Sequence, residues 1–113
     1  MMTKYEICTA GFEIRCGTKR NSIPSYTEWE LFDEANECCY DVVASFDTEE
    51  DAVEFFNKNY KDYGRTWVEH GSVFWLLVGC VAWIEVNNYD DNGEFDSGDS
   101  VIALSAEPYT REE

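Results

Sequence analysis

Basic residues are scarce in this sequence. Lys and Arg together number 8, against 24 Asp and Glu, and the formal net charge is -16. Binding to DNA, RNA or an anionic membrane depends on Lys and Arg displacing counterions, so this charge opposes all three kinds of direct binding. It suits a basic partner instead.

Long apolar runs and export signals are also missing. The most apolar segment, Val73 to Ile84, is shorter than the ~20 residues of a membrane-spanning helix. Residues 1–15 contain no apolar run of signal-peptide length. The five cysteines are odd in number and form no CxxC pair, which favours reduced thiols over a disulfide framework. We therefore expect a soluble, cytoplasmic protein.

Signatures of catalysis are few. His70 is the single histidine, and neither a Gly-x-Ser-x-Gly elbow nor a Ser/His/Asp order accompanies it. Carboxylates are abundant, but general acid/base catalysis needs a cleft that separates two pKa values, and an exposed strand face offers none. We expect no enzymatic activity, no cofactor and no catalytic residue.

The residues that are present can build a core. Hydrophobic residues make up 44% of the chain and aromatics 16%, well above the composition of disordered acidic tails. At this length one core is expected, without a large enclosed site. We predict a single compact domain over residues 1–113, with residues 110–113 as a disordered tail.

Alternation of apolar and polar residues predicts strands over 5–16, 26–32 and 38–46. After the helix, the chain is strand-like again from Thr66 through the apolar run Val73 to Ile84 and in the returning run Val101 to Leu104, which gives two or three further strands. The first strand changes phase at Ala10-Gly11, which suggests a β-bulge. The helical spacing of Ala52, Val53, Phe56 and Tyr60 predicts one α-helix over about 48–62, with Asp47 as its N-cap. The fold class is α+β: one mostly antiparallel sheet of about five to six strands with that helix on one face.

Asn92-Gly93 is the strongest turn signal and predicts a two-residue type I′ hairpin in which Tyr89 faces Asp96. An alternative interpretation is a calcium loop with Gly93 at the sixth position. Oxygen-bearing residues would then occupy its ligand positions: Asn88, Asp90, Asn92, Glu94, Asp96 and Asp99. A calcium-binding module therefore stays open, although strands rather than helices flank the loop.

Acidic residues gather in three places. Glu28 and Glu30 are predicted on one strand face, ~6.6 Å apart. The helix carries a row at i, i+3, i+4 and i+7: Asp47, Glu50, Asp51 and Glu54. The hairpin, called here the acidic finger, adds Asp90, Asp91, Glu94, Asp96 and Asp99, with Tyr89 and Phe95 as candidate anchors.

The size of the charge favours recognition over mere solubility. A small domain needs a net charge of only ~2 to 8 for solubility, so the larger value here imposes self-repulsion unless a partner uses the field. Strand spacings place carboxylates at intervals similar to those of a nucleic-acid backbone. The sequence therefore predicts a surface that competes with DNA or RNA for a basic cleft.

Two segments also resemble a known group of proteins. The helix start Phe46-Asp47-Thr48-Glu49-Glu50-Asp51-Ala52 with Phe55-Phe56, and the hairpin Tyr89-Asp90-Asp91-Asn92-Gly93-Glu94, are similar in style to small acidic proteins of phages and other mobile elements. Some of these are anti-CRISPR or anti-restriction inhibitors that occupy the nucleic-acid channel of a defence enzyme. The resemblance implies an inhibitor of a nuclease or host-defence complex, acting as a DNA mimic.

The functional hypothesis is therefore a non-enzymatic protein that binds a basic nucleic-acid-binding partner, such as a nuclease or defence effector, and neither nucleic acid nor a membrane. One alternative is a structural or interaction module that forms a homodimer through an exposed sheet edge, its acid serving solubility. The calcium-binding module is the other.

Overall fold

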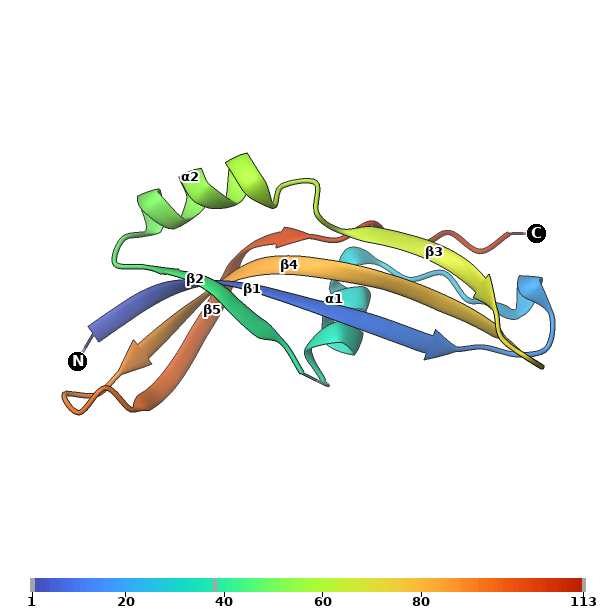
Figure 1. The fold of residues 1–113 in the computed structure, drawn as a ribbon, viewed down its shortest axis with the longest axis horizontal. Coiled ribbons are helices and arrows are strands. Elements are labelled where there is room, and N and C mark those ends of the chain that lie inside the picture. Colours follow the sequence, from blue (N-terminus) through green and yellow to red (C-terminus); the bar gives the residue numbers. More distant parts are fainter. Residues whose placement is uncertain (1, 38, 113) are drawn as a thin grey trace.

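The computed structural model describes residues 2–37 and 39–112, with the backbone alone at Asp99. Figure 1 shows a sheet with one helix on each side. The elements in chain order are β1 (Met2–Arg15), a 3-10 turn (Arg20–Ser22), α1 (Glu28–Asn36), β2 (Asp41–Phe46), α2 (Glu49–Asn59), β3 (Arg65–His70), β4 (Trp75–Tyr89) and β5 (Phe95–Ser105). The α+β class and the antiparallel sheet are confirmed. The expectation of a single helix is wrong, because the described residues form two.

Strand β4 is the centre of the sheet. It pairs with β1 without interruption from Met2↔Tyr89 to Arg15↔Leu76. Its other edge is shared, since β3 pairs with residues 75–80 and β5 with residues 82–89. Strand β2 lies on the outer edge of β1, opposite residues 5–9, and all these pairings are antiparallel.

The long β1–β4 pair makes the molecule elongated. Its extents are 52 × 27 × 18 Å and its radius of gyration is 16.2 Å, against about 13 Å for a compact chain of this length. The two helices therefore cover different lengths of the sheet, and part of each face has no helix over it.

Helix α1 replaces the strand predicted over 26–32. Thr27 is its N-cap: the Thr27 hydroxyl accepts a hydrogen bond from the Glu30 amide, and the Glu30 carboxylate accepts one from the Thr27 amide. This capping box satisfies two amides at the helix start and outweighs a short period-2 pattern. The helix buries Leu31, Phe32 and Ala35 against the sheet.

Helix α2 confirms the predicted helix, with shorter bounds. Its N-cap is Thr48, whose hydroxyl accepts from the Asp51 amide, and the prediction of Asp47 as N-cap is wrong by one residue. Because a cap must reach the amide two or three residues into the helix, Thr48 serves a helix that begins at Glu49. Ala52 and Phe56 are its buried residues.

The change of phase in β1 has a different cause from the predicted bulge. Pairing with β4 continues unshifted through Gly11. Ile7 belongs to the apolar cluster under α2, whereas Cys8, Ala10 and Phe12 belong to the cluster under α1. Adjacent strand residues point to opposite faces of the sheet. The apolar positions therefore shift by one residue where the covering helix changes from α2 on one face to α1 on the other.

Gly79 allows three segments to approach closely. A Cβ atom built there would lie 2.4 Å from the Arg65 carbonyl oxygen and 2.4 Å from the Phe12 ring. Gly11, on the neighbouring strand, has room, since its nearest contact is 3.6 Å away. The absence of a side chain at Gly79 therefore permits the β3 pairing and the Phe12 packing together.

The β4–β5 hairpin has a three-residue loop, so the predicted two-residue turn is wrong. The Gly93 amide donates to the Asp90 carbonyl, and the Asp90 amide donates to the Glu94 carbonyl. Only Gly93 has positive φ among the described residues, whereas type I′ requires it at both central positions. Tyr89 consequently pairs with Phe95 instead of Asp96.

Candidate functional site

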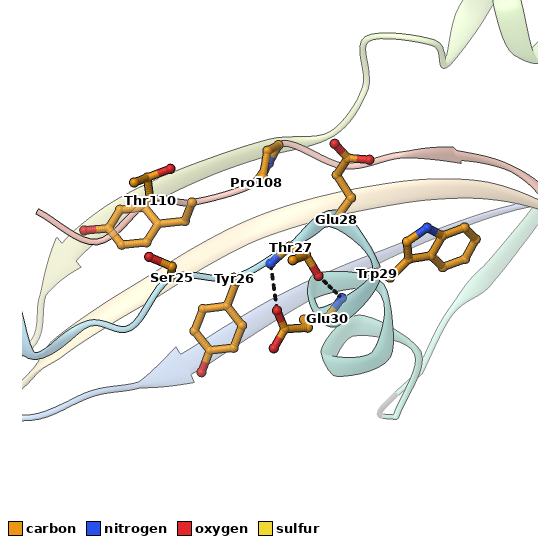
Figure 2. Close-up of a pocket in the computed structure, with 9 residues that line it drawn as sticks. Ser25, Tyr26, Thr27, Glu28, Trp29, Glu30, Pro108 and Thr110 are labelled. Atoms are coloured by element: carbon orange, nitrogen blue, oxygen red, sulfur yellow. Dashed lines mark hydrogen bonds between the residues drawn. The ribbon is translucent and has the colours of Figure 1, made fainter.

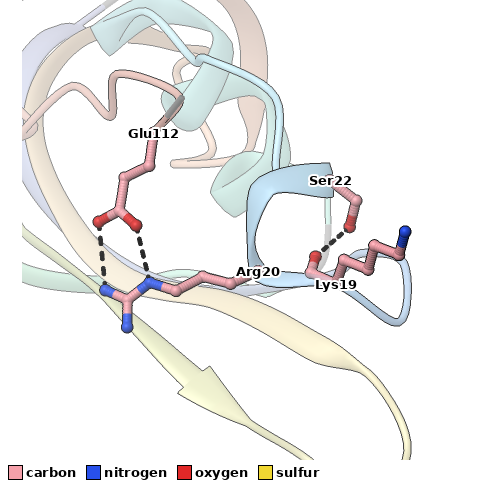
Figure 3. Close-up of polar contacts among 4 residues, drawn as sticks. All are labelled: Lys19, Arg20, Ser22 and Glu112. Carbon is pink, nitrogen blue, oxygen red and sulfur yellow. Dashed lines mark hydrogen bonds and ion pairs between the residues drawn. The ribbon is translucent and has the colours of Figure 1, made fainter.

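The predicted acidic residues lie on three separate elements. Figure 1 places the start of α2 and the β4–β5 turn toward the same end of the sheet. The loop between β1 and α1, which contains Lys19 and Arg20, lies at the opposite end. In Figure 3 the Arg20 guanidinium donates to both oxygens of Glu112, at 2.9 and 3.2 Å. The acidic finger and this basic loop are therefore far apart.

The α2 row is exposed, as its four carboxylate residues all lie at the surface: Asp47, Glu50, Asp51 and Glu54. Asp47 forms an ion pair with Lys4. The ion pairs among the described residues are this one and Arg20–Glu112. Most of the acidic charge on this helix is thus not neutralised within the chain.

Glu28 and Glu30 do not form the predicted acidic strand face. Both lie in the first turn of α1, where Glu30 caps the helix. Figure 2 shows them around a pocket of about 460 Å³ with Tyr26, Trp29 and Pro108. Their carboxylates face the positive end of the helix dipole, which gives them a structural role.

The acidic finger uses several of its oxygens to hold its own shape. Oδ1 of Asp90 accepts from the amides of Asn92 and Glu94, at 2.9 and 3.0 Å. Oδ1 of Asn88 accepts from the Thr3 hydroxyl at 2.7 Å. These atoms occupy ligand positions of the calcium-loop alternative, and among the described residues no group of three or more His, Cys, Asp or Glu is placed to hold a metal ion.

The remaining finger residues are exposed: Asp91, Glu94, Phe95 and Asp96. The side chain of Asp99 lies outside the described residues. Phe95 is 61% exposed and packs edge-on against Tyr89, with ring centroids 6.0 Å apart. The two predicted anchors therefore form one aromatic pair at the base of the finger.

A pair of glutamates that the sequence reasoning missed lies on the sheet face covered in part by α1. Glu6 of β1 and Glu85 of β4 are directly opposite each other in the register. Glu6 is only 8% exposed. Like charges directly opposite in a sheet are destabilising, and a carboxylate this buried needs hydrogen-bond donors.

Four side chains supply those donors. The Trp83 indole N–H donates to Oε1 of Glu85 at 2.8 Å. The Asn87 amide donates to Oε1 of Glu6 at 3.0 Å and to Oε2 of Glu85 at 2.8 Å, which bridges the pair. The Tyr89 hydroxyl donates to Glu6, and the Tyr40 hydroxyl lies 3.5 Å from Glu85.

The carboxylates change the acidity of their neighbours. The pKa of Tyr89 is raised to about 12, first because its hydroxyl donates to Glu6 and then because it is partly buried. Burial and then Glu85 raise the pKa of Tyr40. Burial, followed by Glu85 and Glu6, raises the pKa of the Cys8 thiol far above its usual value. Both phenols stay protonated as donors, and Cys8 is not a thiolate nucleophile.

A groove of about 340 Å³ opens beside Glu85, between the last turn of α1 and the hairpin. Phe32 and Asn36 line it from α1, while Phe95 lines it from β5. Asn87, which is 5% exposed, also lines it. The groove thus combines aromatic walls with a carboxylate and an amide.

Comparison with known proteins gives no relative: no family model, curated protein or solved structure matches this chain. Within the described part of the chain, no helix is long and apolar enough to cross a membrane. The site must therefore be interpreted from its own chemistry.

One sequence signal could have found the glutamate pair. Glu6 and Glu85 each interrupt an apolar stretch, as Tyr5-Glu6-Ile7 and Ile84-Glu85-Val86. A charged residue inside a core strand is rarely buried without partners. The pairing of the two strands was not visible in the sequence, so their meeting was not predicted.

Proposed function

We propose that this protein is a non-enzymatic binding protein. Its acidic end, formed by the start of α2 and the acidic finger, binds a basic, nucleic-acid-binding partner and competes with DNA or RNA for the same basic cleft. Nucleases and host-defence complexes, such as CRISPR or restriction enzymes, are the class of partner in view. The observation that supports it is the exposed carboxylates of α2 and of the finger, which lie toward one end of the sheet.

The electrostatics give a physical reason for such binding. Two ion pairs among the described residues neutralise little of a net charge of -16. Exposed charges of one sign attract a basic cleft over about one Debye length, ~10 Å at 0.1 M salt, and raise the association rate. The basic loop at the far end would orient the molecule so that the acidic end approaches first.

Capture from a bacterial lysate tests the proposal. The immobilised protein should retain basic nucleic-acid-binding proteins at low salt and lose them at 1 M salt, where the Debye length is ~3 Å. Added DNA should displace them. Retention that resists salt, or that shows no basic bias, would contradict the proposal.

Paired charge reversals separate the finger from bulk charge. Glu94→Lys with Asp96→Lys changes two exposed finger carboxylates. Glu13→Lys with Asp62→Lys changes two exposed carboxylates outside the finger and gives the same net charge. The finger variant should lose most of the captured partner and the control should keep it. Equal losses would show that net charge, rather than the finger, governs binding.

Self-association is a second candidate function, and edge strand β2 is the observation that favours it. Val42 and Val43 are 49% and 43% exposed there. Edge strands with apolar side chains are templates for pairing with another chain. A dimer of this kind should persist in 1 M salt and dissociate in Val43→Lys, as measured by analytical ultracentrifugation.

A further inference from the structure

We propose that the groove between α1 and the β4–β5 hairpin binds an arginine side chain of the basic partner. This inference rests on the proposed function and names the chemical group recognised. Beyond the exposed charges already discussed, it depends on the shape of the groove, the charge beneath it and its aromatic walls.

The groove has the size of a side-chain subsite. Its volume of about 340 Å³ is at the lower end of the ~300–1,000 Å³ range of ligand clefts. Glu85 and Asn87 lie on its β4 side, Phe95 and Val101 on its β5 side, and Phe32 and Asn36 on its α1 side. Three elements thus line it.

Two negative features lie at this groove, and a third lies next to it. Glu85 lines it, and Glu6 lies directly opposite Glu85 on the neighbouring strand. Helix α1 presents its C-terminal turn, the negative end of its dipole, and has no basic residue in that turn. No Lys or Arg among the described residues forms an ion pair with either glutamate. A cation is therefore the missing component.

Glu6 adds negative charge next to the groove without lining it. It is more than nine-tenths buried and accepts hydrogen bonds from Asn87 and Tyr89 on Oε1. Its donors are neutral, and a charged donor interacts more strongly with a carboxylate pair than a neutral one.

The aromatic walls favour guanidinium over ammonium. Phe95 is 61% exposed, and Phe32, which packs against Trp83 with ring centroids 5.0 Å apart, also lines the groove. A guanidinium is planar, stacks on aromatic faces, is weakly hydrated and presents five donors to carboxylate and amide oxygens. A lysine ammonium keeps its hydration more strongly and cannot stack.

The test uses acetyl-Gly-Arg-Gly-amide as the probe and the same peptide with citrulline, its neutral isostere, as the control. Proton–nitrogen NMR follows the Trp83 indole and Asn87 amide signals during titration of the full chain. The arginine peptide should shift both signals saturably at millimolar concentration. The citrulline peptide should bind at least tenfold more weakly, about 1.4 kcal/mol.

Variants locate the site. Glu85→Gln and Phe95→Ala should each weaken arginine binding, whereas Glu13→Gln, at an exposed position on β1, should leave it unchanged. Because Phe95 is largely exposed, Phe95→Ala should fold normally. This variant therefore still tests the groove if Glu85→Gln fails to fold. No saturable shift, an equal response to citrulline, or a response to calcium chloride alone would overturn the proposal.

The two proposals fail separately. If the lysate capture succeeds and the arginine peptide does not bind, the groove assignment is wrong while the proposed function stands. If the peptide binds and no basic partner is captured, the groove assignment stands and the proposed partner class is wrong.

Discussion

Two copies of one local motif in neighbouring strands allow a direct test of what burial adds to a hydrogen bond. Trp83 donates its indole N–H to Glu85, two residues later, at 2.8 Å. Trp67 donates to Glu69 in the same manner at 2.7 Å. Trp83 is 0% exposed and Trp67 is 44% exposed. We expect Trp83→Phe to destabilise the protein far more than Trp67→Phe.

The magnitude follows from what each substitution removes. At Trp83 the loss of a hydrogen bond to a carboxylate costs about 1–2 kcal/mol, moderated because Asn87 and Tyr40 still donate to Glu85. Shrinking a fully buried indole to a phenyl ring costs about 1–2 kcal/mol more. The sum of about 2–4 kcal/mol is a large part of the ~5–15 kcal/mol that stabilises a domain. At Trp67 water replaces the bond, and the cost should stay under about 1 kcal/mol.

Urea unfolding followed by far-ultraviolet circular dichroism measures both costs. Tryptophan fluorescence is unsuitable because each variant lacks one indole. The slope of free energy against urea should not change, so the difference should appear in the midpoint. Costs that agree within about 0.5 kcal/mol would refute the reasoning that burial decides the value of this bond.

Three further outcomes are expected. Because the pKa of Tyr89 is raised, the protonated phenol stabilises the fold fully below pH 10, and this stabilisation is lost as the pH rises to about 12. The free energy of unfolding of Tyr89→Phe should therefore depend less on pH in that window. An unchanged pH dependence would show that the titration of Tyr89 does not cause it. Gly79→Ala should cost about 1–3 kcal/mol by overpacking, whereas Gly11→Ala should be neutral or stabilise by about 0.4–1 kcal/mol, both from thermal melts. Cys8, buried and with its pKa raised, should resist iodoacetamide in the folded protein and react in urea, as mass spectrometry of digested protein would show.

The elements with strong, long patterns were predictable from the sequence. Helix α2 has acidic residues at its start, an apolar stripe and Lys58 near its end, and these signals agree. The sequence of α1 predicts a strand because seven residues fit a period of two as well as 3.6. Its capping box, Thr27 with Glu30, is the local signal that distinguishes the two.

The error of register arose within the loop, and the error of phase arose from tertiary structure. Asn92-Gly93 predicts a two-residue turn, but the Asp90 side chain binds the amides of Asn92 and Glu94 and stabilises a longer loop. The phase change at Gly11 depends on which helix covers which face. Neither fact is contained in the residues of the strand itself.

The sequence predicts candidate binding residues when surface exposure is the only property required of them. The acids of the α2 row, and Asp91, Glu94 and Asp96 of the finger, are at the surface, as expected from their polarity. The Glu6–Glu85 pair depends on a contact between residues 79 positions apart, which periodicity cannot supply. For the same reason, the sequence does not indicate that Trp83 and Asn87 donate to this pair.

The placement of the helices on opposite faces, displaced along the shared strands β1 and β4, divides the interior into two unequal parts. The cluster under α2 is the smaller, and two of its five buried residues, Ala52 and Ala82, have minimal side chains. Cooperative units with few buried apolar contacts open at lower free energy than the rest of a fold. The helix that carries the acidic row can therefore detach and reform in amide exchange while the cluster under α1 stays closed. A partner that binds this helix would slow amide exchange in α2 more than elsewhere. Partner binding and the stability of α2 would therefore be linked.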